Sequence, residues 1–323
     1  MIFIQEIKLI IMKKNQKIAL WGLSIIIIAT FSFGGFIYFK HQSEKKIILA
    51  TTTSTYDSGL LDYLLPVFEE QNGITVEILS VGTGQALSIG QSGDADVLLV
   101  HARTREDEFI ANEYGIHRTC VMYNDFILVG PSSNPAHIQN QNLTTALNNL
   151  ISAGENGTIS FYSRGDGSGT HSKELALWDS VGFTPNAFNM TWYKETGASM
   201  GSTLIITNEN QGYTLIDRGT WLATKATVDL VVVHEGDPIL LNPYGAILIN
   251  PEIHSGINFE MAREFVAFLV SEQGQTLINE YKVNGEQLFH ADFGNCDKLT
   301  GCSTTSTEIE YWTNYNGNFT GFD

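Results

Sequence analysis

Beyond residue 46, short apolar runs alternate with amphipathic stretches along the chain, a pattern typical of α/β proteins. The first strands and helices are predicted in alternation. The strands cover residues 47–50, 75–81 and 95–101, and the helices cover 56–71, a segment opening near Gly84, and 103–114. Together they form a βαβαβ unit, which is how a wound α/β domain begins.

The later part of the pattern predicts a second lobe. Residues 126–130 form a predicted strand, and the turn-rich stretch 131–135 is where the chain crosses out of the first lobe. The second lobe is predicted to contain strands near 158–162 and 230–234 and helices over 168–181 and 198–208. The stretch 242–250 then returns the chain to the first lobe, which helices over 259–281 complete. Lobe 1 is thus predicted over 47–128 and 246–292, and lobe 2 over 129–245. Crossings near Gly130 and Tyr244 imply a hinge.

The N-terminal segment, residues 1–46, has the pattern of a membrane anchor or signal. Residues 18–39 carry no charge and are long enough to span a bilayer, and Lys13, Lys14 and Lys17 precede them. No cysteine follows to accept a lipid and no clear cleavage site is present, so we prefer an uncleaved transmembrane helix to a signal peptide. The true start, at Met1 or Met12, stays open.

Charge and cysteine content limit the classes of function. Beyond residue 46, 11 Lys and Arg residues face 33 Asp and Glu residues, a net charge of −22 that should repel nucleic acid and anionic headgroups. An anionic ligand would therefore need local hydrogen-bond donors. Cys296 and Cys302 could form a disulfide, which would leave Cys120 as a buried thiol. Residues 293–323 are predicted to be an appended loop or clasp.

Three segments rich in Thr, Ser and Gly each follow a predicted strand and open a predicted helix: 51–55, 82–85 and 164–171. Helix starts carry free N–H groups and partial positive charge, so they can hold an oxyanion with few full charges. Each segment alone is more often an ordinary cap or turn. Three of them at the ligand-binding edge of an α/β sheet favour an anion site.

Arg164 begins the glycine-rich segment and offers a planar fork of donors to an oxyanion, with an ion pair to Asp166 as its alternative role. Asp166 is expected to orient Arg164 or cap the helix. Residues 196–202 repeat the turn-into-helix chemistry in lobe 2, where Ser199 either completes a cage for the anion or caps the helix.

Catalytic motifs are not evident. Ser168 lacks the glycine two residues earlier that a nucleophile elbow requires, and there is no phosphate-binding P-loop. The histidines show no metal-ligand spacing, and a surface or capping role is expected for each, His101 included. His171 is notable because it lies within the glycine-rich motif. We expect no enzyme activity, no metal cation and no cofactor.

Five motifs occur in order: LATTTST at 49–55, SGLLD at 58–62, VGTGQAL at 81–87, GDADV at 93–97 and SRGDGSGTH at 163–171. Over residues 47–292 they resemble the tungstate-binding protein family of ABC importers. The resemblance implies a two-lobed, type II-like periplasmic-binding-protein fold with the oxyanion in the interlobe cleft. It also implies a membrane permease and its ATPase as partners, and a body on the extracytoplasmic side of the cell membrane. We expect a monomer.

Carried over motif by motif, the resemblance implies ligand contacts from Thr53, Ser54, Thr83, Arg164, Ser168, Gly169 and Thr170, and more weakly from Ser199 and Met200. The chain departs from the family in its anchor without a lipid-accepting cysteine and in the tail beyond residue 292.

Other tetrahedral oxyanions remain as alternatives, because molybdate, sulfate and phosphate can use the same donors. The residues do not separate tungstate from molybdate. Phosphate keeps a proton at neutral pH, and Asp166 is the motif carboxylate that could accept it. From another class, an enzyme could use Arg164, Asp166 and His171 on an anionic substrate.

Overall fold

The computed structural model describes residues 45–293, 306–307 and 310–312. Residues Lys46–Asp323 group into one compact unit, separate from Met1–Lys45, and the fold below is that of its described part. Within these residues, none of the helices combines the length and the apolar character needed to cross a bilayer. The predicted membrane segment, residues 18–39, lies outside the described part of the chain.

The first lobe is built on a mixed sheet that begins with three parallel strands. β1 (Lys46–Thr52) lies between β2 (Thr75–Val81) and β3 (Val97–Val100), which confirms the predicted βαβαβ unit. Antiparallel β9 (Leu241–Ile249) and β4 (Gly115–Gly130) extend the sheet beyond β3, and β12 (His290–Ala291) pairs with β4. The carboxyl ends of the parallel strands therefore meet at one edge.

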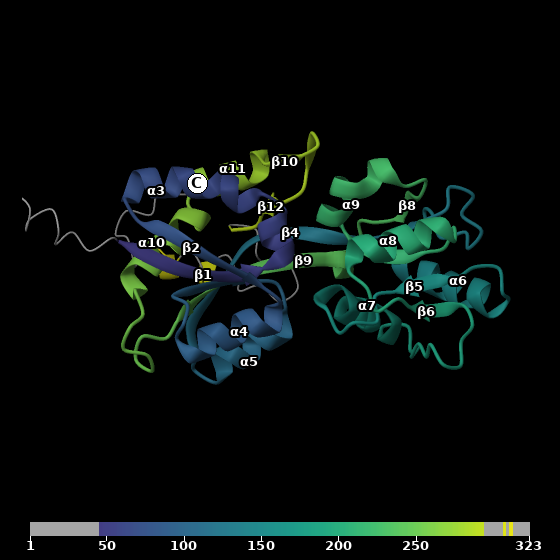
Figure 1. The fold of residues 1–323 in the computed structure, drawn as a ribbon, viewed down its shortest axis with the longest axis horizontal. Coiled ribbons are helices and arrows are strands. Elements are labelled where there is room, and N and C mark those ends of the chain that lie inside the picture. The colour runs from purple at the N-terminus through teal and green to yellow at the C-terminus, as the bar shows by residue number, and fades with distance from the viewer. Residues whose placement is uncertain (1–44, 294–305, 308–309, 313–323) are drawn as a thin grey trace, which may run out of the picture. The chain divides into compact units, whose positions relative to one another are not determined.

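Helices cover both faces of this sheet, with α3, α10 and α11 on one face and α4 and α5 on the other (Figure 1). Their bounds are α3 (Leu60–Asn72), α4 (Thr83–Ser92), α5 (Arg103–Ala111), α10 (Phe259–Val270) and α11 (Glu272–Glu280). Burial on both faces explains why β3 is a continuous apolar run.

The helix predicted over 56–71 is divided in the structure. It consists of α2 (Thr53–Asp57) and α3, separated at Gly59, whose φ of 78° lies in the left-handed region. A Cβ atom there would also lie 2.8 Å from the Tyr281 hydroxyl. The single-helix prediction was wrong because a glycine among helix-favouring residues was not taken as a break.

The second lobe holds the remaining larger elements: α6 (Leu143–Glu155), β5 (Phe161–Ser163), α7 (Gly169–Asp179), β6 (Tyr193–Glu195), α8 (Met200–Glu209), β7 (Thr214–Asp217), α9 (Arg218–Thr224) and β8 (Val231–His234). Its core includes an aromatic cluster in which Phe161 contacts Trp178 edge-on and stacks on Tyr193. The sequence patterns did not predict α6, β6, β7 or α9.

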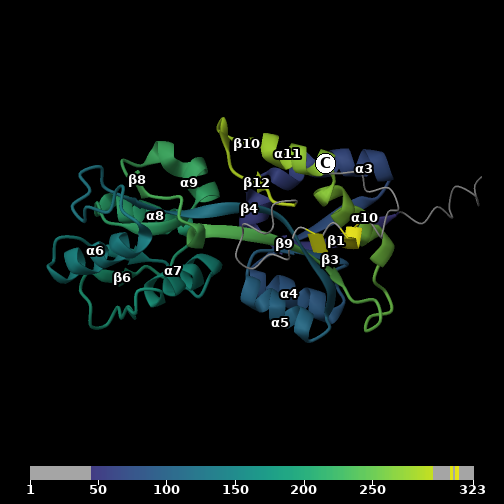
Figure 2. The ribbon, with the colours of Figure 1, turned by 180° about the vertical axis from the view of Figure 1, so that it is seen from behind.

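Strands β4 and β9 run between the two lobes (Figures 1 and 2). β4 pairs with β9 as far as Asp125, opposite Leu241, and with β7 from Phe126 onward. The change of partner thus comes earlier than the crossings predicted near Gly130 and Tyr244, because β4 is one strand of 16 residues. The Arg218 guanidinium bonds both oxygens of Asp125 at this point, at 2.7 and 2.6 Å. The exact lobe boundaries remain a prediction.

The lobes also touch through a short hairpin of the first lobe, β10 (Lys282–Val283) and β11 (Glu286–Gln287). The Asn284 amide donates to the Leu222 carbonyl at 2.9 Å, and Glu286 forms an ion pair with Lys225. Lys225 belongs to a 3-10 turn, η1 (Lys225–Thr227), and a second such turn, η2 (Pro238–Leu240), precedes β9. The hairpin is therefore a further contact between the two lobes, besides β4 and β9.

Cys120, on β4, is fully buried and disulfide-bonded, so its prediction as a free thiol was wrong. The predicted pair of Cys296 with Cys302 lies outside the described residues. Within the tail, Trp312 is buried and donates to the Thr119 hydroxyl at 3.2 Å. Tyr311 stacks on His117 with ring centroids 3.6 Å apart. These described tail residues therefore pack on the first lobe.

Candidate anion-binding site

A cavity of about 1170 Å³ lies between the lobes, at the carboxyl ends of β1, β2 and β3. All nine residues predicted to contact a ligand line it: Thr53, Ser54, Thr83, Arg164, Ser168, Gly169, Thr170, Ser199 and Met200. The first three come from lobe 1 and the other six from lobe 2. The structure thus brings the whole predicted set together, while ligand contact by each residue remains a prediction.

Two helices of the first lobe begin at the cavity. α2 follows β1 directly, and its cap is Thr52, whose hydroxyl accepts from the Thr55 amide at 3.3 Å. Thr53 and Ser54 are exposed and not needed for that capping bond. α4 begins at Thr83 after Gly82, which gives its first amides no side-chain cap. Hydroxyl and amide donors of both segments therefore remain available to a ligand.

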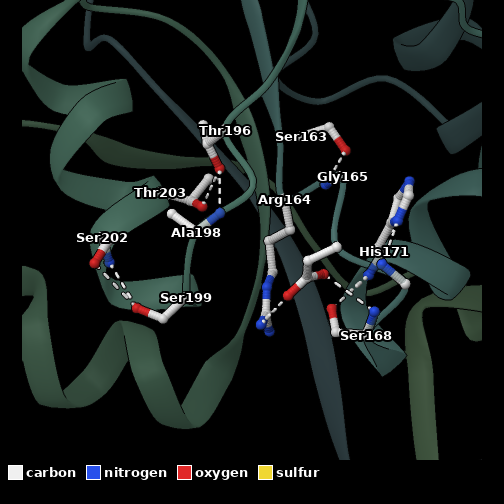
Figure 3. Close-up of polar contacts among 12 residues, drawn as sticks. Ser163, Arg164, Gly165, Ser168, His171, Thr196, Ala198, Ser199, Ser202 and Thr203 are labelled. Carbon is white, nitrogen blue, oxygen red and sulfur yellow. Dashed lines mark hydrogen bonds and ion pairs between the residues drawn. The ribbon is translucent and has the colours of Figure 1, made fainter.

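Two helices of the second lobe begin at the same cavity. The Ser168 hydroxyl accepts from the His171 amide at 3.3 Å and caps α7. In the same way, Ser199 caps α8 by accepting from the Ser202 amide at 3.3 Å (Figure 3). Each serine is thus both a helix cap and a cavity-lining residue. Ser199 can therefore cap α8 and also face a ligand, the two roles predicted for it as alternatives.

Arg164 extends between Ser199 and Ser168 in Figure 3, and all three line the cavity. Its Nη2 donates to Asp166 at 2.5 Å, which confirms Asp166 as an orienting partner, and its buried Nε has no partner. Asp166 also accepts from the Ser168 amide at 3.0 Å. Although burial acts in the opposite direction, the bonds from Ser168 and Arg164 hold the pKa of Asp166 below its ordinary value.

The cavity concentrates positive charge within an acidic body. Four of the 11 Lys and Arg residues beyond residue 46 line it: Arg103, Arg105, Arg164 and Lys173. Two carboxylates, Asp57 and Asp217, line it as well. Low-dielectric walls strengthen such a local field, so the cavity can attract an anion despite the net charge of the protein.

His101 is a cavity residue that the sequence patterns missed, since a surface or capping role was expected for it. It directly follows β3, at the edge where β1 and β2 also end. Its Nε2 lies 3.2 Å from the Thr52 hydroxyl and its Nδ1 lies 3.2 Å from the side-chain oxygen (Oδ1) of Asn242. Its place after a buried strand was the signal that could have found it.

The described side chains that line the cavity are mainly hydrogen-bonding and cationic groups. Among the described residues, no cluster of His, Cys, Asp and Glu could hold a metal ion. The His171 Nδ1 accepts from the Gly167 amide at 2.9 Å, so this histidine braces the glycine-rich turn. The arrangement offers hydrogen-bond donors and positive charge, which suit binding of an oxyanion.

Lys173 was also missed, although it lies one helical turn after Gly169 on α7. Its ammonium donates to the Leu241 carbonyl at 3.1 Å, and burial lowers its pKa to about 8. The positive charge is therefore present below that pH and lost above it, so anion affinity should fall as pH rises through about 8.

We expect Lys173→Met to weaken oxyanion binding roughly three- to tenfold near neutral pH, by removing one cation from the cavity. The variant should also lose the fall in affinity above about pH 8. Calorimetric titration at several pH values checks this, with Lys194→Met, which lies outside the cavity, as control. An alkaline fall of equal size in Lys173→Met would contradict the assignment.

Comparison with known proteins agrees with this geometry. Residues 40–273 match the family model described as a PBP superfamily domain. A tungstate-binding protein TupA from Peptoclostridium acidaminophilum is 48% identical over 242 residues, which cover 75% of this chain and 83% of that protein. The chain belongs to the tungstate-binding protein family. Another family member, TupA from Campylobacter jejuni, is 38% identical, with 74% of this chain and 88% of that protein covered.

Solved structures of the family share the fold. The tungstate-binding protein TupA from Desulfovibrio alaskensis G20 superimposes with a TM-score of 0.72 at 38% identity, covering 76% of this chain and 98% of that one. The resemblance to the tungstate-binding family and the α/β, two-lobed periplasmic-binding-protein fold are therefore confirmed.

Proposed function

We propose that this family member binds tungstate in the interlobe cleft and delivers it to an ABC-type permease for import. The observation that supports this most is the convergence of four helix starts and Arg164, from both lobes, on one cavity. Relatives named as tungstate-binding proteins, at up to 48% identity over three quarters of the chain, support the choice of ligand. Like them, the protein acts as a binding component and not as an enzyme, and needs no cofactor.

The proposed binding mechanism uses donors from both lobes. Thr53, Ser54 and Thr83 provide hydroxyl groups and amides from lobe 1, and the segment from Arg164 to Thr170 provides donors from lobe 2. The cavity volume slightly exceeds the range of about 300–1,000 Å³ typical of small-ligand sites, so closure of the lobes on β4 and β9 would bring both sets onto one anion. The permease could then distinguish the loaded, closed form by its shape.

The geometry at Asp166 favours an oxyanion without a proton. One carboxylate oxygen accepts from Arg164 and the other accepts from the Ser168 amide. Each oxygen keeps a further lone pair, but Asp166 is not among the residues that line the cavity, so it is poorly placed to accept a proton from phosphate. Tungstate, molybdate and sulfate therefore fit this site better than phosphate does, while tungstate is preferred over molybdate on the family relationship alone.

We further propose that the protein acts outside the cytoplasm as a monomer, with residues 18–39 as a transmembrane anchor. The apolar, uncharged run and the lysines before it support the anchor. The permease and its ATPase subunit are the proposed partners. The acidic body supports the absence of a nucleic-acid partner.

Calorimetric titration of Lys46–Asp323, which is a compact unit by itself, tests the proposed function. Tungstate should bind with one ion per chain and in the nanomolar range, roughly −12 kcal/mol. Phosphate, in a parallel titration, should bind at least about a hundredfold more weakly, a difference of roughly 2.7 kcal/mol. Tight phosphate binding without tungstate binding would identify a different importer, and no heat with any oxyanion would refute the proposal.

Thr53→Ala and Ser54→Ala should each weaken tungstate binding by about 1 kcal/mol, because each removes a hydroxyl donor from the cavity. Asn142→Ala is the matched control, since Asn142 caps α6 outside the cavity and its loss should lower protein stability by about 1 kcal/mol. Titrations and thermal melts of all three variants separate binding from capping. A lower melting temperature in Thr53→Ala or Ser54→Ala with unchanged affinity would remove that residue from the site.

A further inference from the structure

His101 connects the first-lobe part of the cavity to both strands that cross between the lobes. Its Nε2 faces two hydroxyl groups, those of Thr52 at 3.2 Å and Ser54 at 3.4 Å. Its Nδ1 faces the side-chain oxygen of Asn242 on β9, and the Asn242 side-chain nitrogen donates to the side-chain oxygen of Asn124 on β4 at 2.8 Å. The ring stacks on Tyr244, with centroids 4.6 Å apart.

These contacts fix the hydrogen positions on the ring. Because the Asn242 amide nitrogen donates to Asn124, it is the carbonyl oxygen of Asn242 that faces His101, and this oxygen can only accept. The Nδ1 of His101 must therefore carry a hydrogen. In the neutral ring, Nε2 then has a free lone pair and must accept a hydroxyl hydrogen from Thr52 or Ser54.

A buried ion pair fixes the backbone next to His101. Glu106 is fully buried, accepts from the Ala102 amide and forms an ion pair with the buried Arg118 at 2.5 Å. This anchoring keeps the ring against the hydroxyl cluster. The neutral ring thus takes up one hydroxyl hydrogen that would otherwise be available to an oxyanion.

Resting on the proposed function, we propose that His101 takes up one proton from solvent at Nε2 when the oxyanion binds. The new N–H bond uses the Nε2 lone pair, and no other covalent bond changes. Nε2 then donates to a hydroxyl oxygen, which releases the hydroxyl hydrogen of Thr52 or Ser54 toward the ligand. The imidazolium also places a positive charge next to the hydroxyl cluster.

The charges around His101 are consistent with a proton taken up on binding. In the ligand-free protein, burial lowers the pKa of His101, opposed by the Asn242 bond and by the charge of Asp217 on β7. Arg103, which begins α5 two residues after His101, and Arg105, Arg164 and Lys173 around the cavity also favour the neutral ring, while Asp57 does not. A bound dianion reverses the sign of this local field, so binding should weaken as pH rises.

Calorimetric titration of the purified protein with dilute tungstate near pH 7, in two non-phosphate buffers of different ionisation enthalpy, tests this proposal. The difference in heat should correspond to uptake of about half to one proton per ion bound. Lys173, with a pKa of about 8, is already charged near pH 7 and contributes roughly a tenth of a proton. Lys173→Met should therefore retain the uptake.

His101→Gln keeps a hydrogen-bonding group that cannot titrate, and its proton uptake should fall to near zero. His254→Gln, whose native ring lies 3.0 Å from the Gln91 carbonyl oxygen and outside the cavity, is the matched control and should behave as the native protein. Tungstate binding by the native protein without proton uptake, or equal uptake in His101→Gln, would overturn the role of His101. If His101→Gln fails to fold, the proton uptake of the native protein in the two buffers still tests the proposal. If the native protein binds no tungstate at all, the proposed function is refuted instead.

Discussion

Arg164→Ala is expected to weaken tungstate binding by about 1.5–3 kcal/mol, roughly 10- to 150-fold, which is the cost of a lost charge-assisted bond. Arg164 lines the cavity, and its side chain is 19% exposed, so solvent screens it only in part. Its removal also leaves the Asp166 carboxylate without its partner, next to the cavity-lining Ser168. Both effects reduce affinity in the same direction.

Three companion variants sharpen this experiment. Arg164→Lys keeps the charge but loses the planar fork, so its affinity should be intermediate. Adding Asp166→Asn to Arg164→Ala should recover part of the loss, because it removes the uncompensated carboxylate. Arg263→Ala, on α10 and outside the cavity, should leave affinity unchanged. Native affinity in a folded Arg164→Ala variant would exclude Arg164 from the site.

Arg118→Met is expected to lower the free energy of unfolding by about 3–5 kcal/mol, because it leaves the Glu106 carboxylate buried without its ion-pair partner. Glu106 is fully buried and Arg118 is 7% exposed, so water cannot replace the lost partner. The Glu106 carboxylate would keep only its bond from the Ala102 amide. Urea unfolding of the native and variant proteins measures the difference.

A second substitution distinguishes this cause from a simple packing defect. Combining Arg118→Met with Glu106→Gln removes the unpaired charge while retaining an acceptor for the Ala102 amide, and should recover most of the lost stability. Exposed Lys282→Met is a control, with an expected change within about 0.5 kcal/mol. A loss below about 1 kcal/mol in Arg118→Met would show that the pair contributes little.

The local chemistry of helix starts explains why so much of the site could be predicted from sequence. Thr52, Ser168 and Ser199 cap helices at positions that their residue types favour. Each segment follows a strand, and parallel strands bring their carboxyl ends to one edge. Local patterns and one topological rule were therefore sufficient to place the nine predicted residues on one cavity.

Residues placed by long-range pairing could not be predicted in the same way. Asn242 and Asp217 reach the cavity because β4 changes partner between β9 and β7, and no local pattern encodes that register. β4 itself was shortened in the prediction because His117, Asn124 and Asp125 interrupt its apolar run. In the structure, their polar groups find partners at the junction of the lobes or against the tail.

The disulfide at Cys120 shows another limit of sequence patterns. The short spacing of Cys296 and Cys302 favoured their pairing with each other, whereas Cys120 lies on a buried central strand. Disulfide connectivity depends on which thiols the fold brings together, and spacing along the chain does not determine it. Packing of Trp312 against Thr119 places part of the tail on that same strand.

Anomalous scattering at a tungsten absorption edge, from crystals of Lys46–Asp323 grown with tungstate, tests the central claim most directly. We expect one anomalous peak per chain, between Ser54 and Thr83 of the first lobe and Arg164 and Ser168 of the second, with oxyanion oxygens about 2.7–3.1 Å from the donors. A peak outside this cavity, or no peak at saturating tungstate, would contradict it.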